Sequence, residues 1–297
     1  MLARAVFHSI TIGCLAAAVA RSVPDRALDS GPHPLCQGFL PKNSLYIAEA
    51  ADPSRATGIS HAEFDEILNR IRDEYSAEIA HRGGRFRIER DWSNGEVNAY
   101  ADRDGRNWII RMFGGMARYP SMTYDGYMAV ACHETGHQVG GVPKFSGGDW
   151  ASVEGEADYY ASLKCLKRIF ARDDNAKILA LRRVDPLAIR QCEREHGGRQ
   201  DQLLCIRATM AGFDLADVLA TLDKAALPKL STPDPRRVTE TFEDHPRAQC
   251  RLDTYFQGSL CRVPYAQPVG DTDYHEGACA DARAFLQGLR PRCWFAP

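Results

Sequence analysis

Apolar and polar positions in the first half of the chain predict one long helix. From Ser60 to Gly84, apolar residues recur at spacings of three and four, which is typical of an amphipathic helix. Ser60 and Glu63 form a capping box at its start, and Gly83-Gly84 ends it. Its apolar positions are Phe64, Ile67, Leu68, Ile71, Tyr75 and Ile79.

Three runs rich in β-branched and aromatic residues follow this helix. They span residues 85–92, 96–102 and 107–113, with the turn sequences "SNG" and "RDG" between them. Strand-like runs joined by such turns predict hairpins. We therefore expect a small antiparallel sheet after the helix.

The rest of the chain is predominantly helical in pattern. A helix is expected from about Thr123 to Val139, where Gly140, Gly141 and Pro143 stop it. The other expected helical segments are 150–170, 175–225 and 246–256. The fold class is therefore α+β, with one main domain over 60–260, an N-terminal lead-in over 21–59 and a cysteine-containing tail over 261–297.

The first twenty residues have the pattern of a secretory signal peptide. A short positive start, an apolar stretch and the small residues Ala18-Val19-Ala20 predict export to the periplasm or medium. Processing as a lipoprotein at Cys14 is a less favoured alternative. No later segment is long and apolar enough to span a membrane, so no integral membrane segment is expected after cleavage.

Composition excludes one class of partner. The chain has 297 residues, 44% apolar and 26% charged, with a net charge of −2. Because acids and bases are interspersed and no basic block occurs, we expect no nucleic-acid partner.

Nine cysteines remain after the expected cleavage. No CxxC pair occurs, so disulfides in an oxidising compartment are favoured over a cysteine zinc cluster. The odd number leaves at least one thiol free or paired elsewhere, and the connectivity stays open, with a Cys132–Cys165 bridge as one possibility. The nine are Cys36, Cys132, Cys165, Cys192, Cys205, Cys250, Cys261, Cys279 and Cys293.

The segment "ACHETGHQVGG" carries the candidate chemistry. His133 and His137 are four residues apart, so on a helix they share a face and can direct two imidazoles at one metal ion. Glu134 is rotated by about 100° and suits a general base acting on a water molecule. The motif alone also fits a helix with two ordinary hydrogen-bonded histidines.

The segment "VEGEAD" supplies the remaining groups of a metal site. Glu154 and Asp158 share one face of the next helix, while Glu156 is expected to point away to solvent. A short Gly-rich loop makes the two helices an antiparallel hairpin. Glu154 is the expected third ligand, and Asp158 is placed to accept the second ring N–H of a ligating histidine. The alternative is a solvated acidic face.

A different zinc arrangement is excluded at one position. In HExxHxxGxxH sites a third histidine follows the glycine. Gly140 is present, but Pro143 occupies the position of the third ligand and cannot bind metal.

Four segments in order resemble the gluzincin zinc metallopeptidases of the CAAX-prenyl-protease and heat-shock membrane protease family, in their soluble minimal form. They are "EVNAYA" (96–101), "VACHETGH" (130–137), "EGEAD" (154–158) and "DHPRAQCRL" (244–252). The chain is most similar to uncharacterised exported bacterial proteins with this core. The resemblance covers about residues 60–255, although the membrane helices of larger family members are absent.

The resemblance implies a mainly helical zincin-type core with the sheet lining a cleft. It implies one Zn²⁺ per chain and a peptide or unfolded-protein substrate. Asn98 and Ala99 would hold that substrate at a sheet edge, chiefly through backbone groups, unless the strand is an ordinary edge strand. His245 would stabilise the oxyanion, or be a structural or surface histidine. Arg251 would support the same region, or be a surface charge.

Two function classes follow from these residues. The first is an exported zinc metalloendopeptidase, in which Glu134 removes a proton from the attacking water. The second is a protein that keeps zinc for structure or only binds peptides. An inert protein could also be a latent enzyme with residues 263–297 blocking the cleft.

Overall fold

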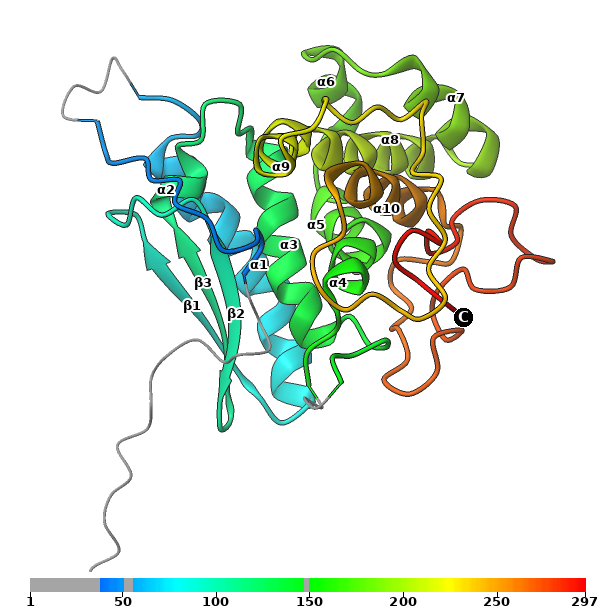
Figure 1. Ribbon diagram of the computed structural model, residues 1–297, viewed down its shortest axis with the longest axis horizontal. Coiled ribbons are helices and arrows are strands. Elements are labelled where there is room, and N and C mark those ends of the chain that lie inside the picture. The colour runs from blue at the N-terminus through cyan, green and yellow to red at the C-terminus, as the bar shows by residue number, and fades with distance from the viewer. Residues whose placement is uncertain (1–37, 51–55, 147–149) are drawn as a thin grey trace, which may run out of the picture. The chain divides into compact units, whose positions relative to one another are not determined.

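The computed structural model describes residues 38–50, 56–146 and 150–297. The predicted signal peptide, Cys14 and Cys36 lie outside these residues. The described helices and strands make a helical molecule with one small sheet, which confirms the predicted α+β class (Figure 1). In chain order they are α1 (His61–His81), β1 (Arg85–Asp91), β2 (Ala99–Asp104), β3 (Asn107–Phe113), α2 (Gly114–Ala117), α3 (Tyr124–Val139), α4 (Glu154–Tyr160), η2 (Ala161–Cys165), α5 (Leu166–Phe170), α6 (Asn175–Ala180), α7 (Pro186–Glu195), α8 (Arg199–Phe213), α9 (Ala216–Asp223) and α10 (Ala248–Leu260).

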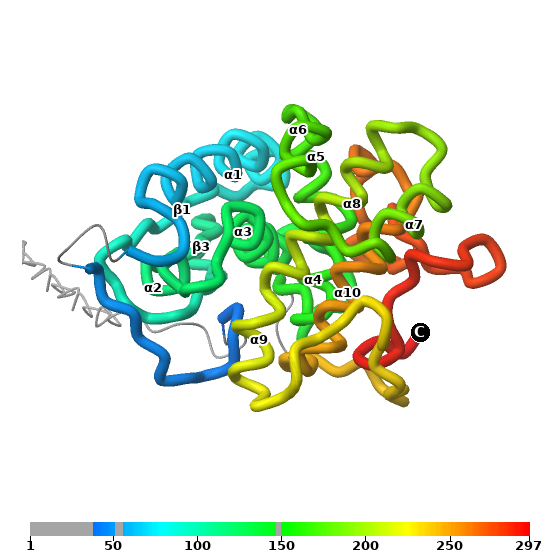
Figure 2. Tube along the Cα trace, turned by 90° about the horizontal axis from the view of Figure 1, so that it is seen from above, coloured from blue at the N-terminus to red at the C-terminus, as the bar shows by residue number. Residues whose placement is uncertain are grey.

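Helix α1 forms as the sequence pattern predicts. The Ser60 side chain accepts from the backbone N–H of Glu63, and the Glu63 carboxylate accepts from the backbone N–H of Ser60, which completes the capping box. All six of its predicted apolar positions are buried. They pack toward the sheet and toward α3, which runs beside α1 (Figure 2).

The sheet is mixed, so the prediction of an antiparallel sheet is wrong for one of its two pairings. The strand order is β1-β3-β2, with β1 parallel to β3 and β2 antiparallel to β3. Only the "RDG" turn makes a hairpin. The "SNG" turn lies in the crossing between β1 and β2, where Arg118 donates to the carbonyls of Trp92 and Asn94. The buried Arg118 side chain thus satisfies the carbonyls of the connection between β1 and β2, which lie on opposite sides of β3.

Helix α3 is the centre of the fold. It lies between the sheet and the helices α4, α8 and α10 (Figure 1), and every residue from Asp125 to Val139 is buried. The Cys132–Cys165 disulfide joins α3 to η2, as the sequence allowed. Because α3 is packed against other elements on every side, its side chains are held in fixed positions.

The helix predicted over 150–170 begins later than expected and contains a π-helical turn, η2. Residues just before it are extended instead. The backbone N–H of Ser152 donates to His137 O, and that of Val153 donates to Pro143 O. Because these amides bond to His137 in α3 and to Pro143 in the loop after it, residues 152 and 153 stay outside the helix.

The C-terminal residues pack against α4 and α10. Disulfides link Cys250 to Cys293 and Cys261 to Cys279, and the Trp294 ring lies against Gly155. Glu156 is fully buried here, so the expectation that it points to solvent is wrong. Arg290 holds it with two hydrogen bonds of 2.5 and 2.7 Å. Burial raises the pKa of Glu156 to about 7, although Arg290 lowers it.

Replacing Arg290 with methionine should destabilise the fold strongly. The change removes the guanidinium and leaves Glu156 buried without a counter-charge, which costs about 3–5 kcal/mol of unfolding free energy. Urea denaturation measures this loss. The control is Arg283→Met, which removes an ion pair with Asp281 whose arginine side chain is 91% exposed, and little change is expected. Equal stability of the two variants would contradict the expectation.

Two further features bear on the compartment in which the protein folds. Among the described residues, no helix is long and apolar enough to cross a membrane. In the described part of the chain eight cysteines form four disulfides, the fourth between Cys192 and Cys205. Disulfides at this density are typical of proteins that fold in an oxidising compartment.

Candidate metal centre

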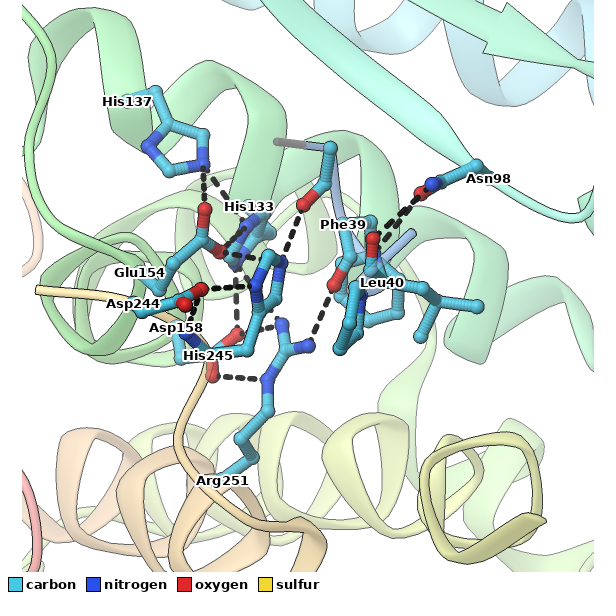
Figure 3. Close-up of polar contacts among 12 residues, drawn as sticks. Phe39, Leu40, Asn98, His133, His137, Glu154, Asp158, Asp244, His245 and Arg251 are labelled. Carbon is cyan, nitrogen blue, oxygen red and sulfur yellow. Dashed lines mark hydrogen bonds and ion pairs between the residues drawn. The ribbon is translucent and has the colours of Figure 1, made fainter. Parts of the chain in front are cut away.

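Helices α3 and α4 bring His133, His137 and Glu154 together. The Nε2 atoms of the two histidines are 3.0 Å apart. Glu154 places one oxygen 3.2 Å from Nε2 of His133 and the other 3.7 Å from Nε2 of His137 (Figure 3). Ligand atoms of a tetrahedral zinc, each about 2 Å from the ion, lie roughly 3.3 Å from one another. The three groups therefore match the spacing of ligands that share one metal ion.

A glycine allows the two helices to approach closely enough for this. A Cβ at Gly136 would lie 2.9 Å from the carbonyl oxygen of Ala157. Gly136 lies between the two histidines in α3, and Ala157 lies between Glu154 and Asp158 in α4. The small residue thus sets the distance between the two pairs of side chains.

Two buried carboxylates at this centre lack hydrogen-bond partners among the described residues. Within residues 38–50, 56–146 and 150–297, neither oxygen of Glu134 or Glu154 makes a hydrogen bond. Glu134 is 0% exposed and Glu154 is 1% exposed. A buried carboxylate without a partner is costly unless a cation or a water satisfies it. The donor set of two imidazoles and one carboxylate fits a divalent metal ion with an open position.

Further hydrogen bonds fix the orientation of both rings. Nδ1 of His133 is 2.7 Å from Asp158 Oδ1, and Nδ1 of His137 is 2.7 Å from Ser152 O. Both partners are acceptors, so each Nδ1 carries the proton and each Nε2 is left with a lone pair. Asp158 therefore lies where the sequence places it, and Ser152 holds the second ring through its backbone.

Arg251 balances the charge of Asp158. It is 1% exposed, and it donates to both oxygens of Asp158 at 2.7 and 2.8 Å. The interpretation of Arg251 as a surface charge is therefore wrong. Burial raises the pKa of Asp158, but Arg251 and His133 hold it below its usual range.

Burial and neighbouring charges shift the other titratable groups in opposite directions. Burial raises the pKa of Glu134 to about 8. Burial also opposes ionisation of Glu154, but His245 and His137 lower its pKa to about 2. Burial lowers the pKa of His137 to about 4. An ionised Glu154 beside a neutral His137 is the state that binds a metal ion.

His245 lies at the edge of the same centre. Its Nε2 is 3.5 Å from Glu154 and donates to Gly38 O at 2.7 Å, while its Nδ1 donates to Asp244 at 2.7 Å. His245 therefore lies within reach of Glu154 and also contacts the chain at Gly38.

Asn98 and Ala99 contact the chain's own residues 39 and 40. The buried Asn98 amide accepts from Leu40 N at 2.9 Å and donates to Leu40 O at 3.1 Å. Ala99 O accepts from Phe39 N at 2.9 Å. Asn98 thus contacts Leu40 through its side chain, whereas Ala99 contacts Phe39 through its backbone; their predicted contact with a substrate stays a prediction. Sequence reasoning missed Gly38, Phe39 and Leu40, whose short apolar run carries no motif.

Comparisons with protein-family models, with curated proteins and with solved structures found no match for this chain.

Proposed function

We propose that this protein is an exported zinc-dependent metalloendopeptidase. The resemblance of four segments to gluzincin peptidases first suggests it, and the donor set of His133, His137 and Glu154 supports it. The four disulfides support export, and a peptide or unfolded protein is the proposed substrate.

The observation that carries the proposal is the environment of Glu134. This carboxylate is fully buried beside the donor set, and neither of its oxygens has a hydrogen-bond partner among the described residues. A purely structural metal site has no use for such a carboxylate, whereas a hydrolase needs a base next to the attacking water.

Each residue then has a distinct part in peptide hydrolysis. His133, His137 and Glu154 would hold the ion, which when bound makes water a stronger nucleophile and polarises a carbonyl. Glu134 takes the proton of the attacking water and gives it to the leaving amine. His245 is positioned to donate a hydrogen bond to the oxyanion. Asp158 and Ser152 keep the imidazoles oriented.

Removal of one ligand should abolish metal binding. The native chain should retain about one zinc ion after dialysis, and His137→Ala should retain none, because a tetrahedral site loses one of its three protein ligands. Elemental analysis of the dialysed protein measures this. His275→Ala is the matched control, since that side chain is 54% exposed and contacts Asp273 and Tyr274, neither of which belongs to the donor set.

The same proteins should be tested for hydrolysis of an unfolded substrate with and without a zinc chelator. Zinc binding that is independent of His137, or hydrolysis that survives complete removal of metal, would overturn the proposed function.

A further inference from the structure

Residues 38–47 lie against the start of β2 and against residues 95–97, which come directly before that strand. Phe39 N donates to Ala99 O at 2.9 Å, Val97 N to Leu45 O at 3.2 Å and Ile47 N to Gly95 O at 2.7 Å. Tyr46 pairs with Glu96 in an antiparallel bridge. The segment thus bonds through its backbone to the first residue of β2 and to the residues that lead into it, as an extended peptide does when it binds at a strand edge.

The first residues of this segment reach the metal centre. Gly38 O accepts from His245 Nε2 at 2.7 Å, and Phe39 O accepts from Arg251 Nη1 at 2.6 Å. Asn98 binds both backbone groups of Leu40 (Figure 3). Three consecutive carbonyls are therefore held by side chains, and two of those side chains also contact Glu154 or Asp158. This is the environment that the proposed function requires for a substrate backbone.

The side chains of Phe39 and Leu40 are buried close to the metal centre. The Phe39 ring is 5.0 Å from the His133 ring in an edge-on arrangement. The Arg251 guanidinium lies 4.3 Å from the centre of the Phe39 ring. Phe39 and Leu40 are both 0% exposed. The residues after Leu40 alternate between exposed and half-buried, and Tyr46 is 68% exposed. The segment is anchored at the metal centre and lies on the surface elsewhere.

Gly38 is the position that only glycine fits. Its φ is +91°, and a Cβ there would lie 2.8 Å from Ala99 O and 2.9 Å from Asn98 Oδ1. Both contacts are to atoms that hold the segment in place. A larger residue at this position would therefore separate the segment from β2 at the end nearest the metal centre.

We propose that residues 38–47 occupy the substrate groove of this protein, so that the chain is latent until the segment is displaced. This rests on the proposed function, because it takes the β2 edge as the site of the peptide. The segment also defines the substrate class: an extended peptide that pairs with residues 95–99 and carries a small, an aromatic and an aliphatic residue in succession.

The experiment compares Gly38→Val with Gly83→Val. Gly83 has a similar φ of +86° but no atom within 4 Å of its Cβ position, so it controls for backbone strain alone. A fluorescent peptide with the sequence of residues 38–47 should bind the Gly38→Val chain, whereas the native chain and Gly83→Val should not bind it. A scrambled peptide should bind none of them. Fluorescence anisotropy measures this binding without any requirement for activity.

Hydrolysis of a quenched peptide containing Gly-Phe-Leu should rise in the same variant. If the groove of the native chain is free one-tenth of the time or less, release raises the apparent affinity for substrate by about tenfold or more. Hydrogen exchange of the Phe39 and Ile47 amides should become faster in Gly38→Val alone.

Three results would overturn the proposal: no binding of the peptide to Gly38→Val, equal binding to the native chain, or unchanged exchange of the two amides. Failure of the proposed function has a different signature. In that case the labelled peptide binds Gly38→Val as expected, but no chain hydrolyses any peptide although zinc is retained.

Discussion

Glu134→Gln should remove peptide hydrolysis and leave zinc in place. Glutamine has nearly the volume of glutamate, so the buried site keeps its packing. The amide cannot accept a proton from water, and loss of a general base costs about 10²–10⁴-fold in rate. Metal content should stay at one ion per chain, because Glu134 is not among the three groups that face one another. Steady-state kinetics and elemental analysis on the same preparations test both parts.

This comparison is best made in chains that carry Gly38→Val, so that latency does not hide the effect. Glu240→Gln is a suitable control, because Glu240 is exposed. If Glu134→Gln hydrolyses peptides at the parental rate with its zinc retained, Glu134 is not the base. If both chains are inert in this background while zinc stays bound, a peptide-binding protein is the better interpretation.

Asp158→Asn should weaken both the metal site and the fold. Asp158 accepts from His133 and twice from Arg251, and all three side chains are buried. Loss of a carboxylate that orients a ligating histidine typically costs 10–100-fold in metal affinity, so a decrease of about that size is expected. Arg251 also keeps its charge without a counter-ion, which costs about 3–5 kcal/mol of unfolding free energy.

Two measurements separate these effects. Titration against a chromophoric chelator gives the zinc affinity, and urea denaturation of the metal-free chain gives the stability. Asp281→Asn is the control, because its carboxylate pairs with Arg283 at the surface. Adding Arg251→Met to Asp158→Asn should restore part of the stability but none of the zinc affinity. An unchanged affinity in Asp158→Asn would show that His133 needs no carboxylate to be oriented.

Local spacing in the sequence is sufficient to predict the groups that lie on the same helix. His133 and His137 meet because residues four apart share a helix face, and Glu154 and Asp158 follow the same rule. The capping box of α1 and the apolar face behind it are local in the same sense. The α+β class could be predicted because it depends on these short-range patterns.

The contacts between distant segments could not be predicted in this way. Gly38 and His245 are far apart in sequence, and so are Arg251 and Phe39. Cys250 pairs with Cys293 rather than with its near neighbour Cys261. Such pairings depend on which segments the fold brings together, and single-sequence periodicity carries no information about that.

The helical wheel was misleading at Glu156 for a related reason. The angle between Glu154 and Glu156 is set by the helix, and the two side chains do point in different directions. The C-terminal residues cover the side of α4 that carries Glu156, and they bring Arg290 within hydrogen-bonding distance of its carboxylate. An acidic residue on the helix side away from a metal ligand is therefore not evidence that this side is exposed to solvent.

The Cys132–Cys165 disulfide has a consequence for how the metal centre assembles. The bond closes a ring over a sequence separation of 33, and that ring contains both histidines, Glu134, Glu154 and Asp158. Even in a denatured chain, these five groups stay on one short covalent loop, which limits the conformational entropy lost when they gather around an ion. A cut anywhere outside the loop leaves all of them on one piece.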